Sequence, residues 1–121
     1  MADASLLECF DNPEPHRDYL IEHVAEEFTS LCPKTGHPDF AQIAFRFVPD
    51  RYCVELKSLK FYLQSYRNDG IFFEAASNRI ADDLATAMAP RWMVVETQWR
   101  SRGGIRTRVR VETGDRRHEA H

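Results

Sequence analysis

The sequence lacks a run of apolar residues close to the roughly 20 that a membrane-spanning helix needs. Its opening stretch contains Asp3 and Glu8 and shows no basic region followed by an apolar core, so no signal peptide is expected. The chain has only three cysteines, an odd number, and a disulfide framework is therefore not expected. These features indicate a cytoplasmic protein that has no membrane partner.

Several functional motifs are also missing. No Gly-x-Gly-x-x-Gly motif follows a predicted strand, which excludes a Rossmann dinucleotide domain. The five histidines show no metal-ligand spacing, and we predict no metal site. The net charge of −3 argues against a protein that mainly binds nucleic acid, although the segment 100–117 is rich in arginine.

The length of 121 residues, of which 43% are apolar and 29% charged, suits a single globular domain spanning residues 1–121. We expect the polar ends, residues 1–11 and 114–121, to be flexible. Residues 19–28 are expected to form either a short strand or an irregular arm.

Hydrophobic periodicity predicts four strands and two helices in the order β-β-α-α-β-β. The predicted strands are 41–48, 52–56, 93–100 and 105–112, and the predicted helices are 58–66 and 72–88. A turn at Pro49-Asp50 pairs the first two strands as a hairpin. Ser58 is the expected cap of the first helix, and Pro90 ends the second.

This order predicts an α+β protein with a four-stranded antiparallel sheet and both helices on one face. Such a sheet exposes its other face and its two edges, and exposed edges favour pairing with another chain. A ring of subunits joined edge to edge would cover them. In the last strand Arg106, Arg108 and Arg110 alternate with mainly apolar residues, so one face of that strand is cationic.

A turn-rich segment, Leu31-Cys32-Pro33-Lys34-Thr35-Gly36-His37-Pro38-Asp39, holds a cysteine and a carboxylate seven residues apart. Its prolines and glycine exclude a continuing helix or a central strand, so the loop can bring Asp39 near Cys32. A nearby cation such as Lys34 would favour the thiolate, and Asp39 could donate the matching proton. A buried, inert cysteine in a tight turn is the alternative.

A second landmark is the run Val54-Glu55-Leu56-Lys57-Ser58-Leu59-Lys60-Phe61-Tyr62. Together with the segment 29–36, Pro38-Asp39-Phe40 and Ser65-Tyr66-Arg67-Asn68, it resembles the 7-cyano-7-deazaguanine reductases, the NADPH-dependent nitrile reductases of queuosine biosynthesis. The similarity extends over residues 12–109. It implies the tunnelling fold of the single-module type, with subunits in a homo-oligomeric ring, a pentamer or a stacked decamer, and with sites between subunits.

The resemblance implies a role for each catalytic residue. Cys32 would add to the nitrile carbon of 7-cyano-7-deazaguanine and form a covalent thioimide, and Asp39 would protonate the nitrogen. Two hydride transfers from two NADPH molecules would then give 7-aminomethyl-7-deazaguanine. Covalent catalysis divides a difficult reduction, because a thioimide accepts hydride more readily than a nitrile does. The alternative for Asp39 is a carboxylate that caps its own loop.

The same resemblance implies two sets of binding residues: Val54, Glu55, Leu56, Phe73 and Glu74 for the substrate, and Leu56, Lys57, Arg102 and Gly103 for NADPH. A carboxylate suits a guanine-type base, because it accepts two hydrogen bonds from adjacent N–H groups. Each charged residue also has a structural alternative. Glu74 favours the helix dipole, Glu55 could be a structural charge at a strand end, and the cations could be solvated.

Phe73 stands where some relatives carry histidine; it can stack on the base but cannot hydrogen-bond. Two other functions stay open on the sequence. One is a different tunnelling-fold enzyme acting on a purine or pterin, which would not need the pair of Cys32 and Asp39. The other is a non-catalytic module that binds a nucleobase or RNA, supported only by the arginine-rich last strand.

Overall fold

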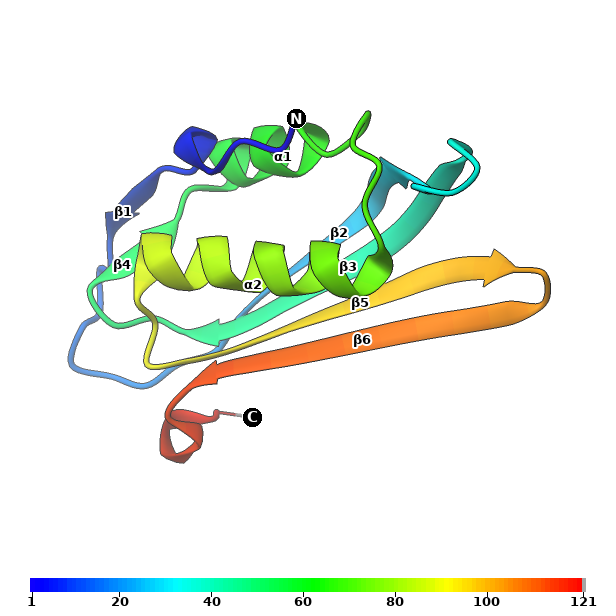
Figure 1. Ribbon diagram of the computed structural model, residues 1–121. Helices are drawn as coiled ribbons and strands as arrows, with labels where there is room; N and C mark the ends of the chain where they lie inside the picture. The colour runs from blue at the N-terminus through cyan, green and yellow to red at the C-terminus, as the bar shows by residue number, and fades with distance from the viewer. Residues whose placement is uncertain (121) are drawn as a thin grey trace.

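Two helices lie side by side over one face of a four-stranded antiparallel sheet in the computed structural model (Figure 1), which describes residues 1–120. His121, the end of the segment expected to be flexible, lies outside the described residues. The sheet order is β2-β3-β5-β6, formed by β2 (Ile21–Leu31), β3 (Pro38–Val48), β5 (Trp92–Arg102) and β6 (Ile105–Gly114). The predicted α+β class and antiparallel sheet are confirmed.

The predicted partner of the strand at 41–48 is wrong. Its hairpin partner is β2, which precedes it, and the connecting loop is the segment that contains Cys32. Residues 52–56 instead contribute β4 (Tyr52–Val54), which pairs with β1 (Cys9–Asp11) in a separate two-stranded sheet. The apolar alternation of β2 is obscured because a β-bulge between Ala25 and Phe28 interrupts its register and glutamates occupy its outward positions.

Helix α1 (Leu56–Gln64) begins two residues earlier than predicted, and its cap is not Ser58. The carboxylate of Glu55 accepts hydrogen bonds from the backbone N–H groups of Lys57 (2.6 Å) and Ser58 (3.0 Å). Ser58 lies inside the helix, where its hydroxyl donates to the Glu55 carbonyl at 2.7 Å. Glu55 therefore has the structural role that was open on the sequence.

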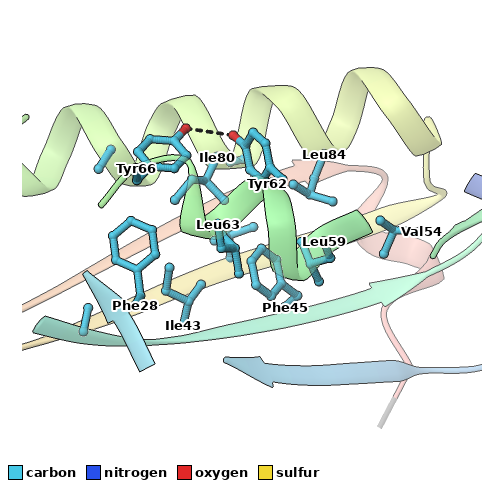
Figure 2. Packing of buried hydrophobic residues seen from close by; sticks show 14 of the residues in the cluster. Phe28, Ile43, Phe45, Val54, Leu59, Tyr62, Leu63, Tyr66, Ile80 and Leu84 are labelled. Atoms are coloured by element: carbon cyan, nitrogen blue, oxygen red, sulfur yellow. Dashed lines mark hydrogen bonds between the residues drawn. The ribbon is translucent and has the colours of Figure 1, made fainter. Parts of the chain in front are cut away.

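Helix α2 (Phe73–Met88) confirms the predicted second helix within one residue. It ends at Ala89, whose φ of 46° is left-handed, directly before Pro90. The helices pack on the face of the sheet formed by β3 residues such as Ile43 and Phe45 (Figure 2). Between them the hydroxyl groups of Tyr62 and Tyr66 lie 2.8 Å apart, so even the centre of the core has satisfied polar groups.

The turn between β5 and β6 consists of Gly103 (φ 57°) and Gly104 (φ 80°). Two successive left-handed residues are typical of a tight hairpin turn, which requires glycine-like freedom at both positions. The turn leaves Arg102 at the last position of β5. It also leaves β2 and β6 as the two edges of the sheet.

The N-terminal segment packs on the domain, with Ala2 buried and its N–H donating to Asp69 at 2.6 Å. At the other end, a short turn, Arg116–His118, follows β6. The flexibility of both ends stays a prediction. Within residues 1–120, no helix combines the length and apolar character required to span a bilayer.

Candidate active site

Cys32 opens the six-residue loop that joins β2 to β3. Its N–H donates to the carbonyl of His37 at 2.8 Å, and its own carbonyl accepts from the N–H of Gly36 at the same distance. Gly36 has a φ of 73°, a conformation that favours glycine. The loop is thus closed on itself, and it places the half-buried thiol at one end of the hairpin.

The segment before α2 fastens this end of the hairpin. The N–H of Leu31 donates to the Asp69 carbonyl at 2.9 Å, and the Leu31 carbonyl accepts from Ile71 at 3.1 Å. Gly70 lies against Pro33, and a Cβ atom at Gly70 would stand 3.5 Å from the Pro33 Cα. The start of α2 is therefore tied to the cysteine loop through the backbone.

Asp39 lies one residue inside β3 and is only 4% exposed. Its Oδ1 accepts a hydrogen bond from Nη1 of Arg102 at 2.9 Å. The same guanidinium reaches the Thr35 hydroxyl at 3.4 Å. A buried carboxyl group needs such a partner, because a polar group buried without a hydrogen bond is costly. The sequence-predicted pair of Cys32 and Asp39 is thus joined by Arg102, which sequence reasoning had placed with the cofactor.

The pKa of the Cys32 thiol is lowered to about 6. The hydroxyl of Thr35 contributes most, followed by the backbone N–H groups of Thr35 and Lys34 and by the guanidinium of Arg102. All of these stabilise the thiolate, so the thiol is mainly ionised at neutral pH. The cation involved is Arg102 and not Lys34, whose side chain was the candidate from sequence. By contrast, burial raises the pKa of Cys9 and Cys53.

Phe73 and Glu74 begin α2 at the same end of the sheet as the cysteine loop (Figure 1). The half-buried Phe73 ring stacks on Trp99 with 4.0 Å between ring centroids and 9° between planes. Trp99 is itself held by its indole N–H, which donates to Thr97 at 2.9 Å. Glu74 is exposed on the first turn. Sequence reasoning missed Trp99, because a tryptophan in a predicted strand reads as a core residue.

Val54, Glu55, Leu56 and Lys57 lie towards the opposite end of the molecule. Val54 follows the far end of β3, and Figure 2 shows it at the other end of the core from Phe28 and Tyr66. An 11-residue strand at about 3.3 Å per residue spans roughly 33 Å between its first and last residues. One copy of the chain therefore does not bring these residues to Cys32.

A groove between α1 and β2 contains Leu56 and Lys57, two of the residues expected to bind NADPH. Leu56 is 60% exposed there, and Lys57 and Lys60 supply positive charge on the α1 side. The β2 wall carries Glu22, Glu26 and Glu27, which would repel phosphate. The positive charge that a phosphate group needs is therefore present on the α1 side of the groove and absent from the acidic strand of the same copy. Arg102 is already engaged by Asp39 at the other site.

Comparison with known proteins places the chain in a family. A family model described as QueF-like protein matches residues 38–118. The NADPH-dependent 7-cyano-7-deazaguanine reductase of Rhodopirellula baltica is 54% identical over 90% of this chain and 90% of its own length. Its counterpart in Pelodictyon phaeoclathratiforme is 59% identical over 88% of this chain and 91% of its own.

Among solved structures, the apo form of the archaeosine synthase QueF-Like superposes with a TM-score of 0.74, covering 79% of this chain and 94% of that one. The sequence identity is only 20%, so this match speaks for the fold alone. The family model covers both helices and the β5–β6 turn, and the relatives align over about nine-tenths of the chain. The chain therefore belongs to the QueF-like family of proteins.

Proposed function

We propose that this protein reduces the nitrile of 7-cyano-7-deazaguanine to 7-aminomethyl-7-deazaguanine with NADPH, a step of queuosine biosynthesis in the cytoplasm. The observation that carries the proposal is a thiol with a pKa of about 6 in the same hairpin as a buried carboxylate. The relatives named as NADPH-dependent reductases of this substrate support it. Inert cysteines in cores do not ionise at neutral pH, as the raised pKa of Cys53 illustrates.

The thiolate of Cys32 attacks the nitrile carbon, and a carbon–sulfur bond forms as the nitrogen takes a proton from Asp39. Leu56 and Lys57 would hold NADPH, and two NADPH molecules in turn would each supply one hydride to this carbon, with the second proton on nitrogen coming from water. The leaving thiolate returns to the environment formed by Thr35 and Arg102, which stabilises it. Arg102 holds Oδ1 of Asp39, so Oδ2 is the oxygen available for the proton.

Phe73 and Glu74 would bind the base. The exposed carboxylate of Glu74 is free to accept two N–H bonds from the pyrimidine edge of the substrate. Phe73 offers a ring for stacking, and Trp99 behind it prevents the ring from swinging away. This arrangement explains why an aromatic residue without an acid–base function serves at position 73.

We infer that a neighbouring copy completes the site with Val54, Glu55, Leu56 and Lys57. Two facts support a ring in which the β6 edge of one copy pairs with the β2 edge of the next. Within one copy, Val54 lies at the end of the core opposite Phe28, and Glu55, Leu56 and Lys57 line a groove along Glu22–Glu27 that does not include the Cys32 loop. The edges also carry opposite charges: Glu22, Glu26 and Glu27 lie on β2, and Arg106, Arg108 and Arg110 lie on β6. A pentamer or a stacked decamer is proposed from the family resemblance.

The decisive experiment mixes the protein with 7-cyano-7-deazaguanine and NADPH and follows the loss of nicotinamide absorbance. Before NADPH is added, intact-mass spectrometry should show one substrate mass per active subunit. Cys32→Ala should abolish both signals, and Cys53→Ala should keep them. An adduct that persists in Cys32→Ala, or a wild type that never oxidises NADPH with this substrate, would contradict the proposal.

A further inference from the structure

Ser30 is a buried residue of β2 whose hydroxyl makes no hydrogen bond within residues 1–120. Its exposed fraction is 0%. It occupies β2 two positions before Cys32, and its cross-strand partner on β3 is Asp39. Most buried hydroxyl groups in folded proteins are bonded, so an orphan beside a proposed proton donor calls for an explanation.

The ladder geometry brings the two side chains together. Phe28 and Ala41, the pair two positions along, both face the core, and Ser30 and Asp39 therefore share that face. Directly opposite residues have Cβ atoms about 4.5–5.5 Å apart. Rotation about the single Cα–Cβ bond of Ser30 thus brings its hydroxyl within reach of the carboxylate.

The free oxygen of Asp39 is Oδ2. Arg102 bonds Oδ1 at 2.9 Å, and Oδ2 accepts no hydrogen bond from any other residue in the described part of the chain. An oxygen that gives up a proton during the reaction becomes negatively charged in a buried place. A second donor would stabilise this charge, because Arg102 bonds only the other oxygen.

We propose that Ser30 is a positioning residue for Asp39, whose hydroxyl bonds Oδ2 when that oxygen has passed its proton to the nitrile nitrogen. The inference rests on the proposed function. During this step the carbon–sulfur bond forms, the proton leaves Asp39 for nitrogen, and Ser30 keeps its own proton.

Other charged groups around Asp39 do not substitute for this donor. Arg102 is engaged at Oδ1, and Cys32 is itself ionised when it reacts. Four other charged or titratable groups lie on the adjoining elements. Lys34 and His37 are exposed on the loop, Asp69 accepts from the Ala2 N–H, and Glu74 is exposed on α2. The two carboxylates cannot donate a hydrogen bond when ionised. Ser30 is the residue paired with Asp39 across the hairpin.

The test compares Ser30→Ala with Ser30→Thr, which keeps the hydroxyl, and with Thr113→Val. Thr113 also has a buried hydroxyl without a partner, but it lies at the far end of β6, opposite Met93. Stopped-flow absorbance gives the rate constant of adduct formation, calorimetric titration into a Cys32→Ala background gives the affinity for the base, and thermal melts give the Tm. Loss of one hydrogen bond to a charged group predicts about a tenfold slower adduct formation in Ser30→Ala.

The affinity of Ser30→Ala should stay within about twofold of the wild type, and its Tm should stay equal or rise, because an unbonded hydroxyl is removed. Ser30→Thr should restore the rate, and Thr113→Val should keep it. The inference is overturned if Ser30→Ala reacts as fast as Thr113→Val, or if its rate, affinity and Tm fall together. A wild type that forms no adduct would refute the proposed function, and the role of Ser30 with it.

Discussion

Arg102 and Asp39 are 63 residues apart in the chain, yet the guanidinium Nη1 of the first lies 2.9 Å from Oδ1 of the second. The contact joins the last position of β5 to the hairpin that carries Cys32. The raised pKa of Arg102, caused first by Cys32 and then by Asp39, reflects its place between these two side chains. Arg102, from the far end of the chain, thus completes the surroundings of Cys32 and Asp39, which otherwise come from one hairpin.

The rate of alkylation of Cys32 should rise with pH in proportion to the fraction of Cys32 that is thiolate. Because its pKa is lowered to about 6, the rate with iodoacetamide should rise as the pH passes about 6 and level off above pH 7. Thr35→Val removes the largest cause of the shift and should move this rise to higher pH, whereas Thr35→Ser should not. Mass spectrometry of the labelled peptide gives the rates. A Cys32 rate that climbs only above pH 8 would show that the thiol is not activated.

Arg102→Lys should slow the chemistry more than it weakens cofactor binding. Lysine keeps the positive charge but cannot reach a carboxylate and a hydroxyl with one planar fork, so we expect about tenfold slower adduct formation or more. Arg100→Lys is the matched control, since Arg100 is exposed and lies over Phe40. If Arg102→Lys changes only the KM for NADPH, the cofactor role implied by the family resemblance is correct and the assignment to the active site is not.

Glu74 and Asp39 should separate binding from proton transfer. Glu74→Gln turns one acceptor into a donor facing a donor, and charge-assisted bonds contribute roughly 1.5–3 kcal/mol each, so the base should bind at least about tenfold more weakly. Asp39→Asn should bind the base nearly as the wild type does and form the adduct about 10²–10⁴-fold more slowly. Calorimetry and stopped-flow absorbance measure the two effects. The opposite pattern would mean that the roles are exchanged.

Glu55 should matter to stability through the N-terminus of α1. Glu55→Ala removes the acceptor for two backbone N–H groups and should cost about 1 kcal/mol of the free energy of unfolding. Glu55→Ser offers a hydroxyl acceptor at the same position and should unfold close to the wild type in urea. If Glu55 also contacts the base, the serine variant will fold normally and bind substrate more weakly. Equal stability of all three proteins would exclude the capping role.

A shared site predicts complementation between two damaged subunits. Cys32→Ala lacks the nucleophile, and Lys57→Ala lacks a charge that we assign to the neighbouring copy. In a ring with heterologous contacts, random mixing at equal amounts puts both intact residues in about a quarter of the sites. Coexpressed subunits should therefore recover about a quarter of the wild-type rate. A mixture no more active than the sum of its separate parts would indicate that each subunit works alone.

The sequence predicted the parts of the fold that have a clean periodicity. Helix α2 and strands β3, β5 and β6 were predicted within a few residues, because their apolar positions repeat at helical or strand spacing. Strand β2 was left undecided, since the bulge at Glu26 and Glu27 breaks its alternation. The short strand β4 was assigned to the wrong partner because local pattern carries no information about which strand it meets.

The candidate site was predictable where the chemistry is local. Cys32 and Asp39 are seven residues apart, and the turn-forming residues between them predict that the chain folds back and brings them close together. The contribution of Arg102 could not be read from its neighbourhood, because a glycine turn with an arginine reads as a solvated surface charge. Ser30 and Trp99 gave no signal of their own, since only the register of β2 with β3 and the docking of α2 place them beside functional residues.

The hairpin between β2 and β3 also has a kinetic consequence. Closing a six-residue loop between neighbouring strands costs little chain entropy, whereas the contact of Arg102 with Asp39 spans 63 residues. We expect the strand pair that flanks Cys32 to form early in folding and the guanidinium of Arg102 to arrive late. A newly made chain then acquires the full nucleophilicity of its thiol only after the sheet is assembled, which limits unwanted oxidation of partly folded molecules during synthesis.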